Sequence, residues 1–128
     1  VRRVSGFRSL AEARYARYLD WLKRLGVVQS WEYEPRTFWF DKPTRPGLKG
    51  IRRGGTSYKP DFLVVFGPLA AKAQAGRTEW HEVKGWMSPR DKAKINRFRR
   101  YYPGETLVVI DSAALSQLRR TCGSLMDL

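Results

Sequence analysis

Apolar residues along the chain follow two spacings, one typical of helices and one typical of strands. From Ser9 to about Leu25 they recur every three or four positions, which predicts a helix that ends at Gly26. A second helix is expected from Ser88 to about Tyr102, because a serine and a proline open it in the order favoured at a cap and first turn. A third helix is expected from Ser112 to Thr121, ended by Gly123.

Four other segments predict strands. Val27 to Phe40 reads as extended structure interrupted near Pro35, and Tyr58 to Phe66 is apolar on both faces, as expected of a central strand. Glu79 to Lys84 and Glu105 to Ile110 complete the set. The expected order is helix, three strands, helix, strand, helix. Because a helix separates the third and fourth strands, we predict an α/β fold with a central mixed β-sheet flanked by helices.

Length and composition indicate one compact domain spanning residues 1–128. The chain is 42% hydrophobic and 13% aromatic, which is enough for a real core. No apolar run approaches the roughly 20 residues of a membrane span, and the N-terminal residues lack the apolar stretch of a secretory signal, so we expect a cytoplasmic protein. The single cysteine, Cys122, excludes an internal disulfide and every multi-cysteine zinc site, and we expect it to be buried.

The net charge of the chain says most about its binding partner. The chain has 25 Lys and Arg against 12 Asp and Glu, a net charge of +13, with a pI near 10.5. Such a surplus is typical of proteins that bind nucleic acid, and an anionic membrane surface is the main competing partner. The basic residues are spread along the chain and not gathered on one amphipathic helix, which favours nucleic acid over a membrane.

Basic residues concentrate in three places. A flexible loop rich in glycine and proline is expected at about residues 41–57, a second basic run lies on the helix that begins near Ser88, and a short arm lies at the N-terminus. These segments could follow a phosphate backbone, although a solvated loop without a ligand is the alternative. The residues predicted to bind nucleic acid are Arg2, Arg3, Arg8, Arg36, Lys42, Arg45, Lys49, Arg52, Arg53, Lys59, Lys94 and Arg97.

The most informative polar residues are Asp61 and, about twenty residues later, Glu82 and Lys84. Residues two apart in a strand share a face, so Glu82 and Lys84 should project together while His81 and Val83 point the other way. Asp61 opens the predicted central strand, where a carboxylate is costly. Two carboxylates and an ammonium group at a sheet edge can hold Mg²⁺ against a phosphodiester. A turn cap at Asp61 and a solvated Glu–Lys pair on an edge strand are the structural alternatives.

The sequence Pro60-Asp61, a spacer, then Glu82-Val83-Lys84 resembles the motif of the PD-(D/E)xK nuclease superfamily. Glu12, on the first predicted helix, stands where that family has an additional helical acid, and the element order agrees with its αβββαβ core over residues 9–110. The resemblance implies catalysis by Glu12, Asp61, Glu82 and Lys84. Asp61 and Glu82 would be metal ligands, Glu12 would complete or support the metal site, and Lys84 would orient water or stabilise charge on the phosphate. Mg²⁺ is the implied cofactor, and Mn²⁺ is expected to substitute.

Within that superfamily, the short chain and the sequence Leu10-Ala11-Glu12-Ala13-Arg14-Tyr15 resemble small phage and archaeal-type Holliday-junction resolvases. The resemblance implies an endonuclease that cuts four-way or other branched DNA, a homodimer, and action in the cytoplasm of a host cell if the chain is phage-encoded. Other endonucleases of the superfamily, with restriction, repair or RNA-directed roles, remain open. So does a non-catalytic basic DNA-binding protein whose acids only support the fold.

Several residues near the motif have competing interpretations. Ser9 and Glu12 have the spacing of a capping box, in which the Glu12 side chain would only serve the helix terminus. His81 adjoins the motif, but strand alternation favours a packed role over that of a general base. Glu34 could add to the acid cluster, although a solvated strand face is favoured. Three aromatic side chains could stack on unpaired bases, namely those of Trp39, Tyr58 and Trp86. For all three, packing in the core is favoured.

Overall fold

The structure, a computed structural model, describes residues 6–40 and 57–126, with side chains up to Gly123. The predictions for the far N-terminal arm and for nearly all of the basic loop therefore lie outside the described residues. Within the described residues, no helix is long and apolar enough to cross a membrane. The predicted positions that lie outside are Arg2, Arg3, Lys42, Arg45, Lys49, Arg52 and Arg53.

The chain forms a mixed α/β fold, as the sequence predicts. Three helices and a four-stranded sheet appear among the described residues in the expected order, with one additional two-stranded hairpin. The elements are α1 (Leu10–Arg24), β1 (Val28–Tyr33), β2 (Phe38–Trp39), β3 (Ser57–Tyr58), β4 (Phe62–Phe66), β5 (Thr78–Lys84), α2 (Pro89–Tyr101), β6 (Leu107–Asp111) and α3 (Ser112–Met126).

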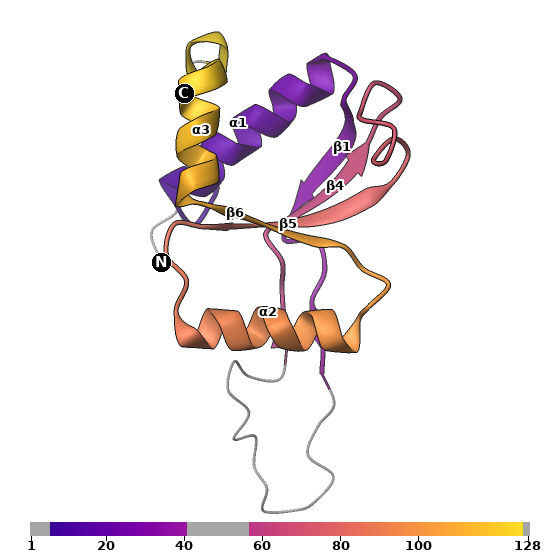
Figure 1. Ribbon diagram of the computed structural model, residues 1–128, viewed down its shortest axis with the longest axis vertical. Coiled ribbons are helices and arrows are strands. Elements are labelled where there is room, and N and C mark those ends of the chain that lie inside the picture. The colour runs from indigo at the N-terminus through magenta and orange to yellow at the C-terminus, as the bar shows by residue number, and fades with distance from the viewer. Residues whose placement is uncertain (1–5, 41–56, 127–128) are drawn as a thin grey trace, which may run out of the picture.

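The main sheet has the strand order β1-β4-β5-β6. β1 and β5 both pair antiparallel with β4, whereas β6 pairs parallel with β5 after the crossover through α2. Figure 1 shows α1 and α3 on one face of this sheet and α2 on the other, with β2 and β3 leading away beside α2. The predicted mixed sheet flanked by helices is confirmed.

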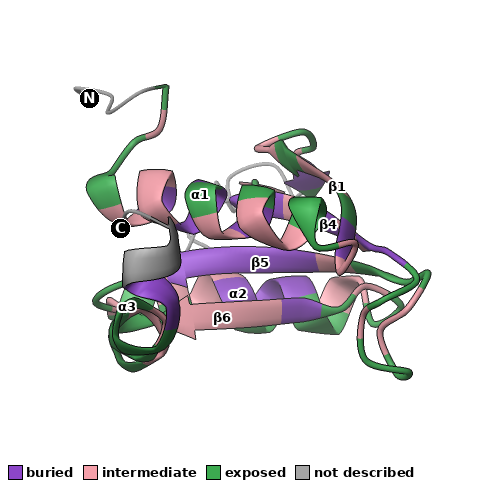
Figure 2. Ribbon diagram, turned by 90° about the horizontal axis from the view of Figure 1, so that it is seen from above, coloured by how far each residue is buried: buried purple, intermediate pink, exposed green. Residues whose placement is uncertain are grey.

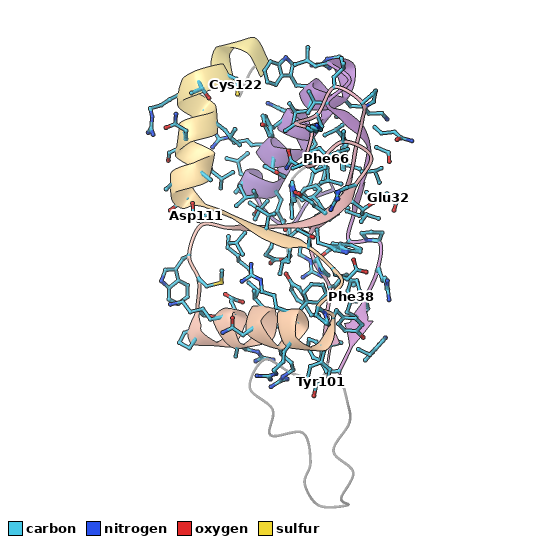
Figure 3. All side chains as sticks on the ribbon, turned by 45° about the vertical axis from the view of Figure 1, so that its right-hand side comes forward. Glu32, Phe38, Phe66, Tyr101, Asp111 and Cys122 are labelled. Carbon is cyan, nitrogen blue, oxygen red and sulfur yellow. The ribbon has the colours of Figure 1, made fainter. Side chains whose placement is uncertain are left out.

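Two aromatic-rich clusters fill the core, one on each face of the sheet. The first lies under α1 and contains Phe62 and Phe66, and the second lies between the sheet and α2 and contains Phe38 and Phe98. Figure 3 shows Phe66 and Phe38 at these separate levels of the molecule. β5 is buried along most of its length, as its colour in Figure 2 shows, because both clusters pack against it.

Local signals fix the ends of the helices. Ser9 caps α1, and Gly26 ends it in the left-handed conformation with φ +80°. The backbone N–H of Val27 donates to the carbonyl of Leu22 over 3.0 Å, which completes a Schellman motif. A side chain at Gly67 would not fit, since its Cβ would stand 2.6 Å from the Gly26 carbonyl oxygen. The turn after α1 and the end of β4 therefore touch through backbone alone.

Two predicted boundaries are wrong. The single strand expected from Tyr58 to Phe66 is two strands, because the chain leaves extended pairing at residues 59–61, where Pro60 has no N–H to donate. α3 also continues through Gly123 to Met126 instead of ending at the glycine. A glycine ends a helix only where it turns left-handed, and inside a helix it costs only about 1 kcal/mol.

Candidate functional site

A cleft of about 180 Å³ lies where the end of β3, the start of β4, the end of β5 and the first turns of α2 meet. It brings together Asp61, Glu82 and Lys84, which the sequence predicts as one site. Four acidic and four basic residues line it, so the cleft is polar. Its lining is Arg8, Glu34, Tyr58, Lys59, Asp61, Glu82, Lys84, Asp91, Lys94 and Ile95.

Asp61 lies in the break between β3 and β4 and is 7% exposed. Its Oδ2 accepts a hydrogen bond from the backbone N–H of Val83 over 2.7 Å, which ties it to the neighbouring strand β5. Its own carbonyl oxygen accepts from the backbone N–H of Glu34 over 2.7 Å, just after β1. The carboxylate is thus held at the cleft by backbone groups from both flanking strands.

Glu82 and Lys84 share one face of β5, as the alternation predicts. Glu82 is 4% exposed and accepts a hydrogen bond from the Tyr58 hydroxyl, with 2.6 Å between the oxygens. The Lys84 ammonium lies 3.8 Å from Glu82 Oε2 and 3.7 Å from an oxygen of Asp91 on α2. Because its side chain is one-third exposed, Lys84 keeps access to the cleft while being held between two acids.

Glu12 serves the cap of α1 through its backbone, and its carboxylate lies beside Asp61, while its part in a metal site stays a prediction. Its backbone N–H donates to the Ser9 hydroxyl over 3.1 Å, so it belongs to the cap of α1. Its carboxylate is buried, accepts a hydrogen bond from the Tyr33 hydroxyl over 3.2 Å, and adjoins the Asp61 carboxylate. Glu12 is not part of the cleft lining, so it supports Asp61 from behind.

Asp61 and Glu82 both ionise less readily than exposed carboxyl groups, because both are buried. Burial, the Glu82 charge and the adjoining Glu12 raise the pKa of Asp61 to about 9, and the hydrogen bond from Val83 offsets only part of this. Burial likewise raises the pKa of Glu82. A cation bound in the cleft would favour the ionised form of both groups.

The donor set fits a hard divalent cation such as Mg²⁺, because Asp and Glu oxygens from separate elements converge beside a polar cleft. In the described part of the chain, no three His, Cys, Asp or Glu side chains already stand in a metal-binding arrangement. The Asp61 and Glu82 oxygens are instead directed to Val83 and Tyr58. Asp61 Oδ2 and Glu82 Oε1 are therefore occupied by hydrogen bonds from the fold.

His81 lies on the opposite face of β5, and its predicted packed role is confirmed. Its Nδ1 is 2.6 Å from the Tyr15 hydroxyl of α1, and its Nε2 is 2.9 Å from a carboxylate oxygen of Glu79. Burial lowers the pKa of His81. The side chain belongs to a polar network under α1, separated from Glu82 by the sheet.

Three polar residues of the cleft were not among the predicted site residues. Glu34, for which a solvated strand face was favoured, lines the cleft with its side chain 12% exposed and pairs with Arg8 over 3.4 Å. Its φ of 48° is unusual for a residue other than glycine. Tyr58 and Asp91 reach the site only through strand register and the placement of α2. No local pattern signals either of them.

Five of the residues predicted to bind nucleic acid lie in the described part of the chain, and they divide into two groups. Lys59 and Lys94 line the cleft, in keeping with a role in binding phosphates. Arg8 reaches it too, although it is paired with Glu34.

The other two described basic positions are engaged by the fold. Arg36 lies 4.1 Å from the centre of the Phe38 ring and 3.8 Å from a Glu105 oxygen. Arg97 is only 9% exposed and lies over the Phe40 ring. Lys94 and Arg97 therefore differ in access to solvent, although the sequence groups them on one helical face.

The aromatic predictions also divide. Tyr58 is buried as expected, whereas Trp39 and Trp86 are 62% and 76% exposed, so the favoured core packing is wrong for both tryptophans. Cys122 is buried as expected, and its Sγ donates to the Leu118 carbonyl over 3.1 Å.

Comparison with known proteins does not assign the chain to a family. No protein-family model matches the chain, no curated protein matches it, and no solved structure matches it. The function is therefore argued from the chemistry of the cleft.

Proposed function

We propose that the chain is a metal-dependent DNA endonuclease that hydrolyses phosphodiester bonds, with a preference for branched DNA such as a four-way junction. The observation that supports this best is the convergence of Asp61 and Glu82 beside Lys84, in a polar cleft of a protein with net charge +13. Buried acids without a compensating cation are costly, and they cluster at functional sites more often than in structural cores.

In this proposal Asp61 and Glu82 hold Mg²⁺, and Glu12 supports them from behind. The bound ion would supply positive charge to the phosphate and favour deprotonation of the attacking water. Lys84 has the reach to donate to a phosphate oxygen and stabilise the charge that develops on it, because its ammonium is held at the cleft by Glu82 and Asp91. Lys59 and Lys94 would bind the flanking phosphates.

The preference for branched DNA and the homodimer rest on the resemblance to junction resolvases and are part of the proposal. Restriction, repair or RNA-directed cleavage by the same site would use the same residues. The test is to compare cleavage of a four-way junction with that of a linear duplex of the same sequence, each with Mg²⁺ or Mn²⁺. We expect the junction to be cut and the duplex to remain largely intact.

Asp61→Ala and Glu82→Ala should abolish cleavage while DNA binding is retained or tightened, because these carboxyl groups offer no attraction to the phosphates and the basic residues around the cleft remain. Glu32→Ala is the matched control. This acid lies on the outer strand β1 of the same sheet and is exposed, as Figure 3 shows, so its loss should leave cleavage unchanged. Equal cleavage by wild type and Asp61→Ala would contradict the proposal.

A second candidate is a non-catalytic DNA-binding protein. It is favoured by the hydrogen bonds that satisfy Asp61 and Glu82 within the fold, from Val83 and Tyr58. In that case purified wild type would bind DNA but cut neither linear nor branched DNA with either metal ion. Asp61→Ala and Glu82→Ala would then change stability and leave no cleavage to compare.

A further inference from the structure

Trp86 occupies the short bend between the proposed site and helix α2. It follows Lys84 by two residues and precedes Ser88, the cap of α2, by two. Two residues of chain span at most about 7 Å, so the backbone of Trp86 stays within that distance of Lys84. Lys84 and Asp91 on either side of the bend both line the cleft. The backbone of Trp86 therefore lies beside the site, although Trp86 is not one of the residues that line the cleft.

The side chain of Trp86 is 76% exposed, and it makes no ring contact with the other described residues. In contrast, Trp80 is 3% exposed and packs edge-to-face on Phe38, and Trp31 packs on Phe62. Tryptophan exposes a large apolar face only at a cost in hydration. The next residue, Met87, packs into the core cluster on the α2 face, which anchors the bend while leaving the indole outside.

We propose that Trp86 is a stacking platform for an unpaired nucleobase next to the phosphate held at Lys84. Every base has a π-face that stacks on an aromatic side chain without sequence preference. In a continuous duplex the two neighbouring bases cover that face, whereas at a branch point, flap or gap it is free. The stacking role rests on the proposal that the protein binds nucleic acid. It deepens that proposal, because it gives a physical basis for preferring branched DNA to duplex DNA.

The charges around the bend favour a nucleic acid over an apolar partner. Lys84 and Lys94 line the cleft below it, and the exposed Arg90 and Lys92 occupy the first two turns of α2. An exposed aromatic side chain close in the chain to several basic residues suits a ligand that has a phosphate and a flat ring in each unit. Trp39, the other exposed tryptophan, lies near the opposite end of α2, where its carbonyl accepts a hydrogen bond from Tyr102.

Equilibrium binding without divalent ions tests the proposal independently of cleavage. The two probes are a four-way junction with one unpaired base at its centre and a fully paired duplex of equal length, at one fixed salt concentration. Trp86→Ala should weaken binding of the first probe by roughly 5- to 150-fold and leave duplex binding unchanged. Trp86→Phe should recover most of the loss, and Trp39→Ala, about 20 Å away along α2, should cause none.

Replacing the unpaired base by an abasic site completes a double-mutant cycle, in which the protein side chain and the base are removed separately and together. Wild type should then bind the junction as weakly as Trp86→Ala does, and the variant should lose nothing further. Equal losses by Trp86→Ala on junction and duplex, or no loss on either, would overturn the stacking role. If wild type cuts no DNA with Mg²⁺ but the cycle behaves as described, the nuclease proposal fails and the stacking platform stands.

Discussion

Asp61 Oδ2 accepts a hydrogen bond from the backbone N–H of Val83, with 2.7 Å between the two atoms. The two residues are 22 positions apart in the chain, and they meet because β4 and β5 pair antiparallel with Phe62 opposite His81. The same register puts Glu82 beside Asp61. This hydrogen bond and the strand register together hold Asp61 next to Glu82.

Stability should depend on pH through Asp61. Since its pKa is raised from 3.8 to about 9 in the fold, the folded protein keeps a proton that the unfolded chain has lost. Without metal ions, the free energy of unfolding should therefore fall as pH rises from 7 to 9, by at most about 1.4 kcal/mol per pH unit for this group. Urea denaturation in EDTA measures the slope.

Asp61→Asn and added Mg²⁺ should each reduce that slope, the first by removing the titrating group and the second by favouring the carboxylate. His81 contributes little to the slope between pH 7 and 9, because its ordinary pKa of 6.5 lies below this window and burial lowers the pKa further in the fold. An unchanged slope in Asp61→Asn would show that this carboxyl group is ionised in the fold.

His81→Gln separates a packed histidine from a general base. Because His81 is buried between Tyr15 and Glu79 on the face away from Glu82, cleavage should change by less than about threefold, whereas loss of a general base costs about 10²- to 10⁴-fold. Initial rates on the preferred DNA measure this.

Burial lowers the pKa of His81, so the folded protein binds fewer protons than the unfolded chain below the ordinary value of 6.5. The wild type should lose stability as pH falls through that value, and His81→Gln should lose less. A hundredfold fall in cleavage in a variant that remains folded would assign His81 to the reaction.

Asp91 is expected to be a positioning residue for Lys84. Asp91→Asn keeps an oxygen that can accept from the Ser88 N–H but removes the charge that lies 3.7 Å from the Lys84 ammonium. We expect kcat to fall about tenfold with KM little changed, because substrate binding does not need the pair but the alignment of the ammonium does.

Ser88→Ala is the control for this prediction. It removes the hydroxyl that caps α2 and should cost about 1 kcal/mol of stability while kcat is retained. If Ser88→Ala and Asp91→Asn slow cleavage equally, Asp91 acts through the stability of the helix and not through Lys84.

Lys94 and Arg97 should differ in their effect on DNA binding, although both are basic and lie on α2. Lys94→Ala should reduce the slope of log affinity against log salt concentration by about 0.9, the value for one lost phosphate contact. Arg97→Ala should leave the slope unchanged and lower stability, because Arg97 is buried over the Phe40 ring. Fluorescence anisotropy with labelled DNA measures both slopes. Equal slopes in Lys94→Ala and wild type would remove Lys94 from the DNA-binding surface.

The helix ends and the main strands could be predicted because their causes are local. Ser9 and Ser88 cap their helices, and Gly26 turns left-handed, whatever the rest of the chain does. Alternation along β5 was enough to put Glu82 and Lys84 on one face and His81 on the other. Gly123 shows where local reasoning fails, since the same residue type that ends α1 is carried inside α3.

The sequence by itself determined the inventory of the proposed site: two acids at motif spacing, a lysine two residues on, and an excess of positive charge. The tertiary structure alone decided which partners surround them. Tyr58 donates to Glu82, Glu34 and Asp91 reach the cleft, and Trp86 stays outside the core. Caps and alternation depend on neighbours in the chain, whereas these contacts depend on strand register and helix packing between residues far apart in sequence.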